Sequence, residues 1–474
     1  MDPRIRELLE RANPWWTHPG ARVPGTKPVR RDAFRKVADL SLSFAPGEKR
    51  RATILVGLRQ VGKTVLAREV AAEGLPRLGG TQLAIVEVDD PRLTGALTLA
   101  DVLHAWDPHR VPGRPALLVV DEIQKLSSGG GERDWARQLA GVVNRDEIRV
   151  LATGSAAGVL RGGGADLAGR ADNVILEPLS FPEFRRLRAG AKTSPPQETR
   201  FLDRDHYLSV GGFPEFTQTL DVRLSLERTR DYVQNVLRAD LAAFRAHASI
   251  VRLFAVLMDQ SGEELNASGL ATKLQVAQNT LKSWLDGLEE VFLVQRVPRL
   301  ETSELRKIAS RPKVHATDPG LIAAFAPGAD PLEVPRIRGR LFESAVLRHL
   351  RELASRARGE VLCAQRRGTA GEPLGEADFL LEAGDEAFFV EVKSGEPPGS
   401  EGAERLLALS RDIREIQGGG KPKDVRVLIV HGGSTREACG LPCVPLVDFL
   451  DAVLAGPASD PCASLRGLCG APGS

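Results

Sequence analysis

Short apolar runs separated by polar loops dominate the first third of the chain. Residues 50–57, RRATILVG, read as a buried strand, and residues 63–72, KTVLAREVAA, have the apolar spacing of a helix. Similar apolar runs follow at 82–90, 117–120 and 148–153. Strands that alternate with helices predict a parallel sheet wrapped by helices, with ligands bound beyond the carboxyl ends of the strands.

The pattern in the middle of the chain is mostly helical. Residues 200–247 predict a helical lid, in which Gly211 and Gly212 permit a sharp turn. Residues 264–300 predict helix, turn, helix and strand, the order of a winged helix, whose second helix can enter a DNA major groove. Winged helices also serve as protein-docking modules or connectors, and these alternatives stay open. The side chains suited to DNA are Lys273, Gln275, Gln278, Asn279, Thr280 and Lys282.

The last third of the chain predicts a second α/β domain. An amphipathic helix at 339–353 is followed by a hairpin of two strands within 375–395. A helix at 402–417 and a strand at 424–430 continue the domain, and the tail from residue 457 is rich in small residues.

Composition narrows the class of protein only slightly. The chain has 474 residues, of which 42% are hydrophobic and 27% charged, with a formal net charge of +2. No apolar run is long enough to span a membrane and the first residues do not resemble a signal peptide, so we expect a cytoplasmic protein without a membrane partner. Cys439 and Cys443 have loosely zinc-like spacing, but a reduced protein without a metal or disulfide role for its five cysteines is the plainer interpretation.

The N-terminal segment offers two features that could contact other parts of the molecule. Trp15 and Trp16 are expected to dock within the chain, with docking on a neighbouring subunit as the alternative. The basic residues between 30 and 36 either contact phosphates or form a solvated face.

A phosphate-binding loop follows the first predicted strand. Residues 57–64, GLRQVGKT, fit G-x-x-x-x-G-K-[ST] in full. Glycines let the backbone N–H groups curl toward phosphate oxygens, and the helix that begins at Lys63 adds its positive end. Lys63 would reach the β and γ phosphates, while the Thr64 hydroxyl would bind Mg²⁺. The predicted nucleotide-binding residues of the loop and helix are Gly57, Gly62, Lys63, Thr64 and Val65.

Acidic and polar residues at later strand ends predict hydrolysis. Asp121 would hold Mg²⁺, and Glu122 would act as general base toward the attacking water. Thr153 could lie beside the γ-phosphate as a sensor, although Thr-Gly-Ser is also an ordinary turn. Arg170 is our candidate for the arginine that neutralises the transferring phosphate, and Arg59 in the loop is the rival.

Three acids and a lysine in the last domain predict a second metal site. Asp378 begins one strand of the hairpin, and Glu391 and Lys393 end the other, so their side chains could meet. Asp378 and Glu391 could bind one Mg²⁺, Glu343 on the preceding helix could complete the site, and Lys393 could activate water. The order helix-Glu, Asp, Glu-x-Lys resembles the PD-(D/E)xK nuclease core. The alternative is a nuclease-like fold that does not cut.

The motifs taken together resemble a known family. GLRQVGKT, LLVVDEIQ, LATGS, LAGR, LEPLSFPEF and YLSVGGFPEF occur in order, and KVHATDPGLIAAF and GRLFESAVLRHL follow. They resemble prokaryotic AAA-type ATPases with a C-terminal DUF4143 domain. The resemblance implies ATP binding and hydrolysis, and it places the chain in the catalytic-glutamate branch of P-loop proteins. A small-molecule kinase is disfavoured because Asp121 and Glu122 suit water activation.

We therefore predict an α/β protein. A P-loop NTPase parallel sheet is followed by a helical lid, a winged-helix-like segment and an α/β restriction-endonuclease-like domain. The expected boundaries are 1–45 for the N-terminal segment, 46–190 for the ATPase core, 191–250 for the lid, 251–325 for the winged helix, 326–335 for a linker, 336–456 for the nuclease-like domain and 457–474 for the tail.

The expected activity is that of a Mg²⁺-dependent ATPase. ATP and Mg²⁺ are the expected cofactors, and DNA and a second copy of the chain are the candidate partners. DNA cleavage stays open, because a nucleotide-gated switch or scaffold with a non-catalytic C-terminal domain is the alternative function.

Overall fold

The fold is described from a computed structural model of the whole chain. The residues described are 3–45, 51–90, 92, 97–126, 134–144, 147–155, 167–190, 195–244, 246–301, 310–328, 330–367, 373–416, 424–434, 437–438 and 440–470. The chain divides into two compact units, Met1–Glu177 and Pro178–Ser474. Among the described residues, no helix combines the length and the apolar character needed to cross a bilayer.

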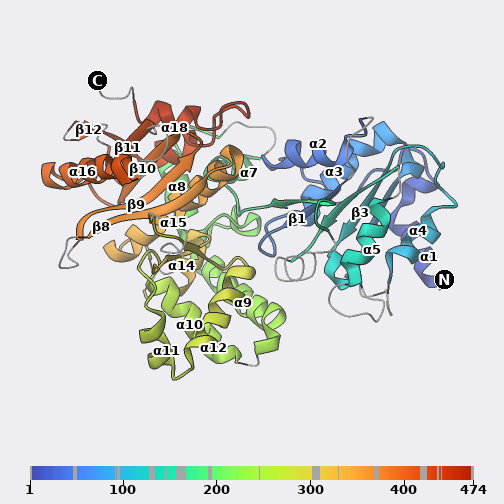
Figure 1. The fold of residues 1–474 in the computed structure, drawn as a ribbon. Helices are drawn as coiled ribbons and strands as arrows, with labels where there is room; N and C mark the ends of the chain where they lie inside the picture. The colour runs from blue at the N-terminus through green and yellow to red at the C-terminus, as the bar shows by residue number, and fades with distance from the viewer. Residues whose placement is uncertain are drawn as a thin grey trace. The chain divides into compact units, whose positions relative to one another are not determined.

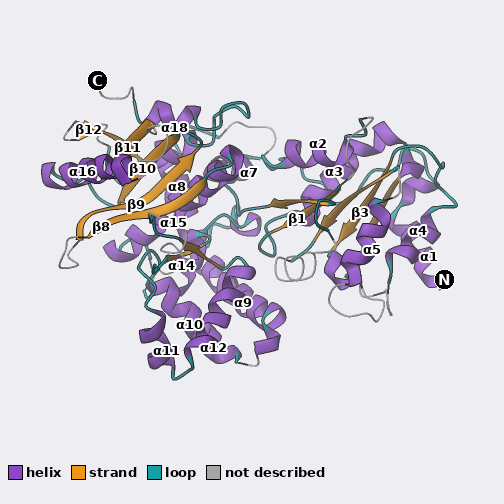
Figure 2. Ribbon diagram, viewed as in Figure 1, coloured by secondary structure: helices purple, strands orange, loops and turns teal. Residues whose placement is uncertain are grey.

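The first unit contains a five-stranded sheet whose paired strands are all parallel, as the alternating pattern predicted. The strand order is β2-β3-β4-β1-β5. The strands are β1 (Ala52–Val56), β2 (Leu83–Glu87), β3 (Ala116–Asp121), β4 (Ile148–Thr153) and β5 (Ala171–Ile175). Each residue of β1 is buried, because helices cover a parallel sheet on its faces. Figures 1 and 2 show this sheet with its helices.

Helices and the N-terminal segment complete the first unit. The helices are α1 (Pro3–Ala12), α2 (Phe34–Leu42), α3 (Lys63–Leu78), α4 (Leu99–Trp106) and α5 (Asp134–Val143). Asn13 protects the edge strand β2: its side-chain oxygen accepts from the Ile85 N–H at 2.6 Å, and its amide donates to the Ile85 carbonyl at 2.9 Å. The indoles of Trp15 and Trp16 both donate to the Leu83 carbonyl, which confirms docking within the chain.

The second unit begins with helices. They are α7 (Phe181–Ala189), α8 (Arg200–Val210), α9 (Val222–Asp240), α10 (His247–Asp259), α11 (Ala267–Leu274) and α12 (Gln278–Glu290). A two-stranded antiparallel sheet of β6 (Val294–Val297) and β7 (Lys313–Ala316) follows. Asn266 caps α11, because its side chain accepts from the Gly269 N–H. The element order from α10 to β7 is the one that the winged-helix prediction requires, and the assignment itself stays a prediction.

A six-stranded mixed sheet forms the later part of the second unit, in the order β12-β13-β11-β10-β9-β8. The strands are β8 (Glu360–Arg367), β9 (Pro373–Ala383), β10 (Glu386–Lys393), β11 (Asp424–His431), β12 (Glu437–Ala438) and β13 (Leu441–Pro445). The hairpin of β9 and β10 is antiparallel, as predicted. The helices are α14 (Pro319–Phe325), α15 (Pro335–Ala357), α16 (Ser400–Ile416), α17 (Leu446–Ala452) and α18 (Ala463–Leu468).

Helices α15 and α16 build the core of this sheet. Leu406 and Leu409 of α16 join a buried cluster with Leu380 of β9 and Phe389 of β10. Alternate strand residues point to opposite faces, so Phe388, which lies outside that cluster and is fully buried, faces away from α16. Helix α15 packs against β8, β9 and β10, and the sheet is therefore an internal layer.

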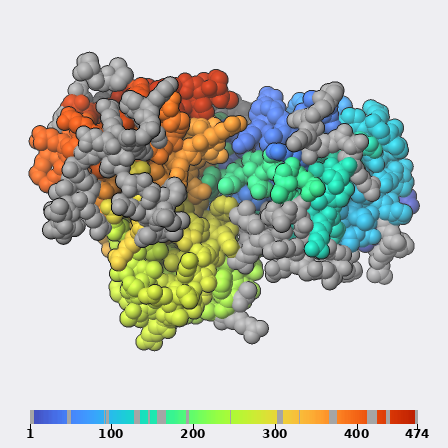
Figure 3. Space-filling view, viewed as in Figure 1, coloured from blue at the N-terminus to red at the C-terminus, as the bar shows by residue number. Residues whose placement is uncertain are grey.

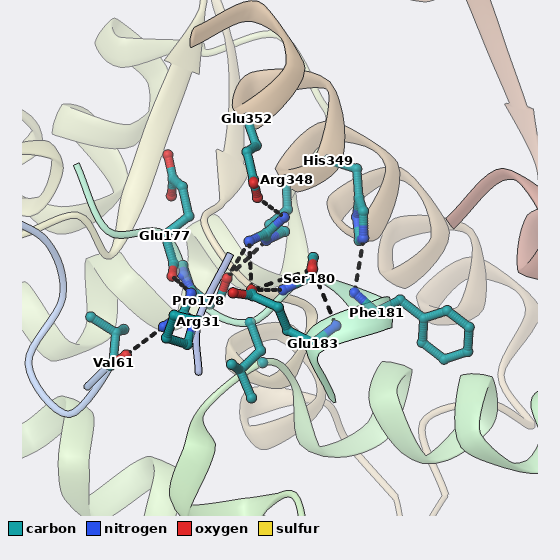
Figure 4. A network of polar contacts seen from close by, with 12 residues as sticks. Arg31, Val61, Glu177, Pro178, Ser180, Phe181, Glu183, Arg348, His349 and Glu352 are labelled. Carbon is teal, nitrogen blue, oxygen red and sulfur yellow. Dashed lines mark hydrogen bonds and ion pairs between the residues drawn. The ribbon is translucent and has the colours of Figure 1, made fainter. Parts of the chain in front are cut away.

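The division between the two compact units falls after Glu177. The expected end of the ATPase core at residue 190 stays a prediction. The first residues of the second unit bond to α15 (Figure 4). Arg348 donates to the Pro178 carbonyl at 2.5 and 2.9 Å, and the Phe181 N–H donates to His349 Nε2 at 3.0 Å. The remaining boundaries stay predictions.

Candidate nucleotide-binding site and acidic cluster

The loop between β1 and α3 has a backbone that requires glycine. Gly57 has a φ of +150°, and a Cβ there would lie 2.4 Å from the Leu176 carbonyl oxygen. Gly62 has a φ of +96° and precedes the first residue of α3. Left-handed backbone and close packing are both costly for other residues. The glycines of the motif therefore shape a curled loop at the amino end of α3.

Lys63 lies over this loop. Its side chain is buried and its ammonium group donates to the Gly57 carbonyl at 3.0 Å and the Leu58 carbonyl at 2.6 Å. A buried ammonium group needs such partners, since an unpaired buried charge is expensive. Val65 follows in the first turn of α3 and is half-buried. The positive charge is thus held beside the loop backbone by residues of the loop itself.

Three predicted side chains meet at the carboxyl ends of β3 and β4. The Thr64 hydroxyl donates to both carboxylate oxygens of Asp121, each at 3.0 Å. The Thr153 hydroxyl also donates to Asp121. Burial raises the pKa of Asp121, and the hydrogen bonds from Thr153 and Thr64 oppose that rise. Parallel strands present their carboxyl ends at one edge of the sheet, which is why residues distant in sequence converge here.

Glu122 directly follows this network. It has a φ of +56° in the left-handed region, and its N–H donates to the Thr153 hydroxyl at 3.1 Å. Gln124 donates to the Glu122 carboxylate at 2.5 Å and to the Ser155 hydroxyl at 3.4 Å. Sequence reasoning did not single out Gln124. Its only signal is its position two residues after the predicted general base.

The residues present fit a nucleotide with Mg²⁺. Thr64 and Asp121 supply hard oxygen atoms within 3.0 Å of each other, the kind of ligand that Mg²⁺ prefers. The curled glycine loop, the buried Lys63 and the amino end of α3 supply donors and positive charge for phosphates. These features share one edge of the sheet.

Arg170 does not lie at that edge, and its role at the transferring phosphate stays a prediction. Ala171 pairs with Ala52 at the amino ends of β5 and β1, so Arg170 lies at the opposite edge from the loop that follows Val56. A residue that precedes a strand lies at the amino end of that strand, whereas the ligand binds beyond the carboxyl ends. The rival, Arg59, is half-buried within the loop.

A second polar cluster forms in the sheet of the second unit. The Asp378 N–H donates to the Glu391 carboxylate at 3.3 Å, and the Val392 N–H donates to the Asp378 carboxylate at 2.8 Å. Lys393 donates to Glu391 at 2.5 Å. Burial alone would lower the pKa of Lys393, but Glu391 and Asp378 raise it overall. The hairpin therefore brings the predicted acids and lysine together.

Lys313 of β7 enters the same cluster and was missed by sequence reasoning. Its side chain is 9% exposed, and its ammonium group lies 2.6 Å from Glu376 and 3.8 Å from Asp378. These carboxylates outweigh burial and raise the pKa of Lys313. Lys313 belongs to the motif KVHATDPGLIAAF, whose pattern gives no indication of chemistry.

Glu343 of α15 completes the cluster. Burial raises its pKa to about 8, with a contribution from Asp378. Burial, followed by the charge of Asp378, raises the pKa of Glu391 to about 7. Across the described part of the chain, no group of three or more His, Cys, Asp or Glu side chains is arranged to hold a metal ion. The acids lie beside lysines here, and their assignment as metal ligands stays a prediction.

The cysteines contribute no described cluster. Cys363, Cys443, Cys462 and Cys469 are buried free thiols. Cys439 lies outside the described residues, so the pair with zinc-like spacing is not tested.

Buried polar groups explain two of the motifs in the second unit. The Asp318 carboxylate accepts from the N–H groups of Gly212 and Gly320, at 2.8 and 2.9 Å. A Cβ at Gly211 would lie 1.8 Å from Asp318 Oδ1. Burial raises the pKa of Asp318 to about 7. Gly211 and Gly212 therefore let the backbone approach a buried acid, in addition to forming the predicted turn.

Comparison with family models identifies two segments. Residues 49–185 match the AAA domain, and residues 202–331 match a domain of unknown function, DUF8612. The first match supports an AAA-type P-loop ATPase domain. The expected DUF4143 domain is not shown by these matches, and the family found over the middle of the chain is a different one.

Proteins of similar sequence carry no established activity in their names. The chain is 23% identical over 283 residues to the uncharacterized protein MJ1637 of Methanocaldococcus jannaschii, covering 54% of this chain and 58% of that protein. It is 26% identical over 310 residues to the uncharacterized protein Rv2008c of Mycobacterium tuberculosis, covering 64% and 61%. The chain therefore spans about three fifths of the length of these relatives.

Solved structures give weaker likenesses. The Aeropyrum pernix ORC2 protein, in ADPNP-ADP complexes, is 13% identical with a TM-score of 0.38, covering 63% of this chain and 94% of that one. The AMPPCP-bound DnaA of Aquifex aeolicus is 16% identical with a TM-score of 0.30, covering 56% and 92%. TM-scores this low do not support an assignment of function, and the AAA domain match remains the informative comparison.

Proposed function

We propose that the first unit binds ATP with Mg²⁺ and hydrolyses it. The observation that carries the proposal is the convergence of Thr64, Asp121 and Thr153 beside the glycine loop at one edge of the sheet. Hydrolysis of a nucleotide needs a phosphate cradle, a metal site and a group that orients water. This edge supplies residues for each of the three.

Each residue has a distinct part in this proposal. The loop amides and Lys63 bind the phosphates, and Thr64 and Asp121 would hold Mg²⁺, which neutralises the developing charge when it is bound. Glu122 accepts the proton of the attacking water. Thr153, which bonds both Asp121 and the Glu122 backbone, positions these two acids relative to each other.

The test is ATP binding and turnover by the purified full-length chain. Wild type should bind ATP with Mg²⁺ by calorimetry and release phosphate, and Lys63→Ala should abolish turnover. Lys282→Ala, a change to an exposed lysine of α12, is the matched control and should behave as wild type. Absence of nucleotide binding by folded wild type, or undiminished turnover by Lys63→Ala, would contradict the proposal.

For the second unit we propose a nuclease-like fold of the DUF4143 type that handles DNA. Support comes from the meeting of Asp378, Glu391 and Lys393 on adjacent strands. The ion pair of Lys313 with Glu376 favours the non-catalytic alternative, because a cation of the chain already balances the acids. A DNA digestion assay with Mg²⁺ or Mn²⁺ separates them: cleavage that is lost in Asp378→Ala and Lys393→Ala supports a nuclease, and equal behaviour excludes one.

DNA binding by the winged-helix-like segment is proposed from its exposed polar residues. Lys273, Gln278 and Lys282 are exposed on α11 and α12, which form part of the surface in Figure 3. Lysines of this kind contact phosphates rather than read bases, so binding should weaken with salt. ATP turnover measured with duplex, single-stranded and branched DNA tests the link, and stimulation by one of them is the expected result.

A further inference from the structure

Arg31 contacts the backbone of the phosphate loop. Its guanidinium group donates through Nη1 to the Val61 carbonyl at 2.6 Å and through Nη2 to the Glu177 carbonyl at 2.8 Å (Figure 4). Val61 is fully buried and is the loop residue before Gly62 and Lys63. We propose that Arg31 is a positioning residue for the phosphate loop, an inference that rests on the proposed ATPase function.

The geometry of the peptide unit connects this contact to the phosphate. The Val61 carbonyl and the Gly62 N–H belong to one planar trans peptide, so they point in opposite directions. Arg31 holds the Val61 carbonyl, and the Gly62 N–H is thereby held in the opposite direction. In this proposal that direction is toward the bound phosphate. Gly62 has a φ of +96°, in a region where glycine is conformationally free and needs an external restraint.

The second contact makes the restraint rigid. Glu177 follows β5, the strand that pairs with β1, so its carbonyl belongs to a segment anchored in the sheet. The planar guanidinium presents two donors in a fixed fork, which ties the loop peptide to that anchored segment. A lysine has a single ammonium group on a flexible stem and does not reproduce this fork.

The neighbouring Arg30 provides a matched control. It lies over the Phe34 ring, with its guanidinium carbon 4.0 Å from the ring centroid, and it donates to Glu73 at 3.3 Å. These contacts involve α2 and α3 rather than the loop. Arg30→Met therefore removes the same charge and a similar side chain from the same segment.

The experiment measures ATP binding to the full-length chain by calorimetry in Mg²⁺, together with kcat, KM and thermal unfolding without nucleotide. Arg31→Met should weaken ATP binding about tenfold to a hundredfold, the effect of losing one positioned donor to a charged group. KM should rise more than kcat falls, because Arg31 does not touch the attacking water. Arg30→Met should bind ATP as wild type does.

Arg31→Lys keeps the charge and should give an intermediate loss, which covers the case in which Arg31→Met does not fold. If either folded Arg31 variant binds ATP as tightly as wild type, or is only less stable, the positioning role is excluded. If wild type and Arg30→Met bind no ATP, the proposed function itself fails. The two failures are thus distinguishable.

Discussion

The two polar clusters of this chain both gather acids on the strands of a sheet, but they give those acids different partners. In the first unit, Asp121 accepts hydrogen bonds from the hydroxyls of Thr64 and Thr153. In the second unit, Glu391 pairs with Lys393, and Lys313 pairs with Glu376 beside Asp378. Hydroxyl groups donate hydrogen bonds to a carboxylate but leave its negative charge unbalanced. Lysines donate hydrogen bonds and also balance the charge.

This difference indicates what each site is prepared to receive. A carboxylate whose partners are neutral retains its negative charge and can bind a cation, which in the proposed function is the Mg²⁺ that enters with the nucleotide. Carboxylates that already have ammonium partners gain less from a metal ion. Motif spacing alone does not separate the two cases, because both clusters match acid patterns known for Mg²⁺ sites. The charge of the partners does separate them.

The largest expected effect is on hydrolysis in the first unit. Glu122→Gln removes the base but keeps the size and the left-handed position of the residue. Turnover should fall by at least about a hundredfold, the usual contribution of general base catalysis, while ATP binding is retained. Phosphate release and calorimetry on the same preparation measure both. A variant that still turns over at the wild-type rate would contradict the role of Glu122 and remove one side of the comparison.

The next largest effect concerns Lys313, the buried lysine beside the acids of the second unit. Lys313→Met leaves Glu376 and Asp378 without this partner and should lower the free energy of unfolding by about 2–3 kcal/mol. This estimate is smaller than the loss of stability expected for a fully buried ion pair, because the Glu376 side chain is 42% exposed. Chemical denaturation measures it.

Divalent ions sharpen the same experiment. Mn²⁺ without nucleotide should recover part of the stability lost in Lys313→Met and should change wild type less, because only the variant lacks the cation. Lys282→Met, on an exposed face of α12, is the control. Equal responses of wild type and Lys313→Met to Mn²⁺ would show that Lys313 does not take the place of a metal ion.

Local patterns predicted the parts of these sites that lie close together in sequence. The apolar run before Gly57, the glycine loop and the helix from Lys63 follow one another directly, and the parallel sheet is confirmed. Chain order also contained a warning about Arg170: it precedes its strand, so it begins at the edge opposite to the ligand. Its role as the arginine at the transferring phosphate stays a prediction.

Those local patterns could not predict contacts between residues that are far apart in the sequence. Lys313 reaches Glu376 across 63 residues of sequence, from 313 to 376, and Arg31 reaches Val61 and Glu177. Neither lysine nor arginine has a spacing rule for such partners, since the pairing depends on which elements pack together. The basic run around Arg31 left two alternatives open, phosphate contact or a solvated face, and neither is tested. The contact of Arg31 is with the loop backbone.

A third arrangement, in which backbone amides satisfy a buried acid, predicts a pH effect. Burial raises the pKa of Asp318 from 3.8 to about 7, so between these values the folded chain holds a proton that the unfolded chain has lost. Its contribution to stability therefore falls as the pH rises through this window and is level above it. Thermal unfolding at pH 5 and pH 7.5 should show a smaller change for Asp318→Asn than for wild type.

The slope with pH, rather than stability itself, tests Asp318. An asparagine places an NH₂ group against one of the two backbone N–H donors and lowers stability at every pH. Asp330→Asn alters an exposed aspartate and should keep the wild-type slope. An unchanged slope in Asp318→Asn would mean that this acid does not titrate in the window.

The smallest expected effect returns to the first unit and to the neutral partners of its acids. Gln124→Ala removes the amide that donates to Glu122 at 2.5 Å, without changing a charge. We take the lower end of the range for a hydrogen bond to a charged group, about 1.5 kcal/mol, so kcat should fall about tenfold while ATP binding is unchanged. Gln124→Asn, which keeps the amide on a shorter stem, should recover little of the loss if the position of the donor matters.

Lys125→Ala, at the neighbouring position and paired with Asp89, should leave kcat unaltered. If Gln124→Ala weakens ATP binding instead, the amide supports the phosphate site rather than the base, and the neutral contacts of Glu122 and Asp121 would have separate roles.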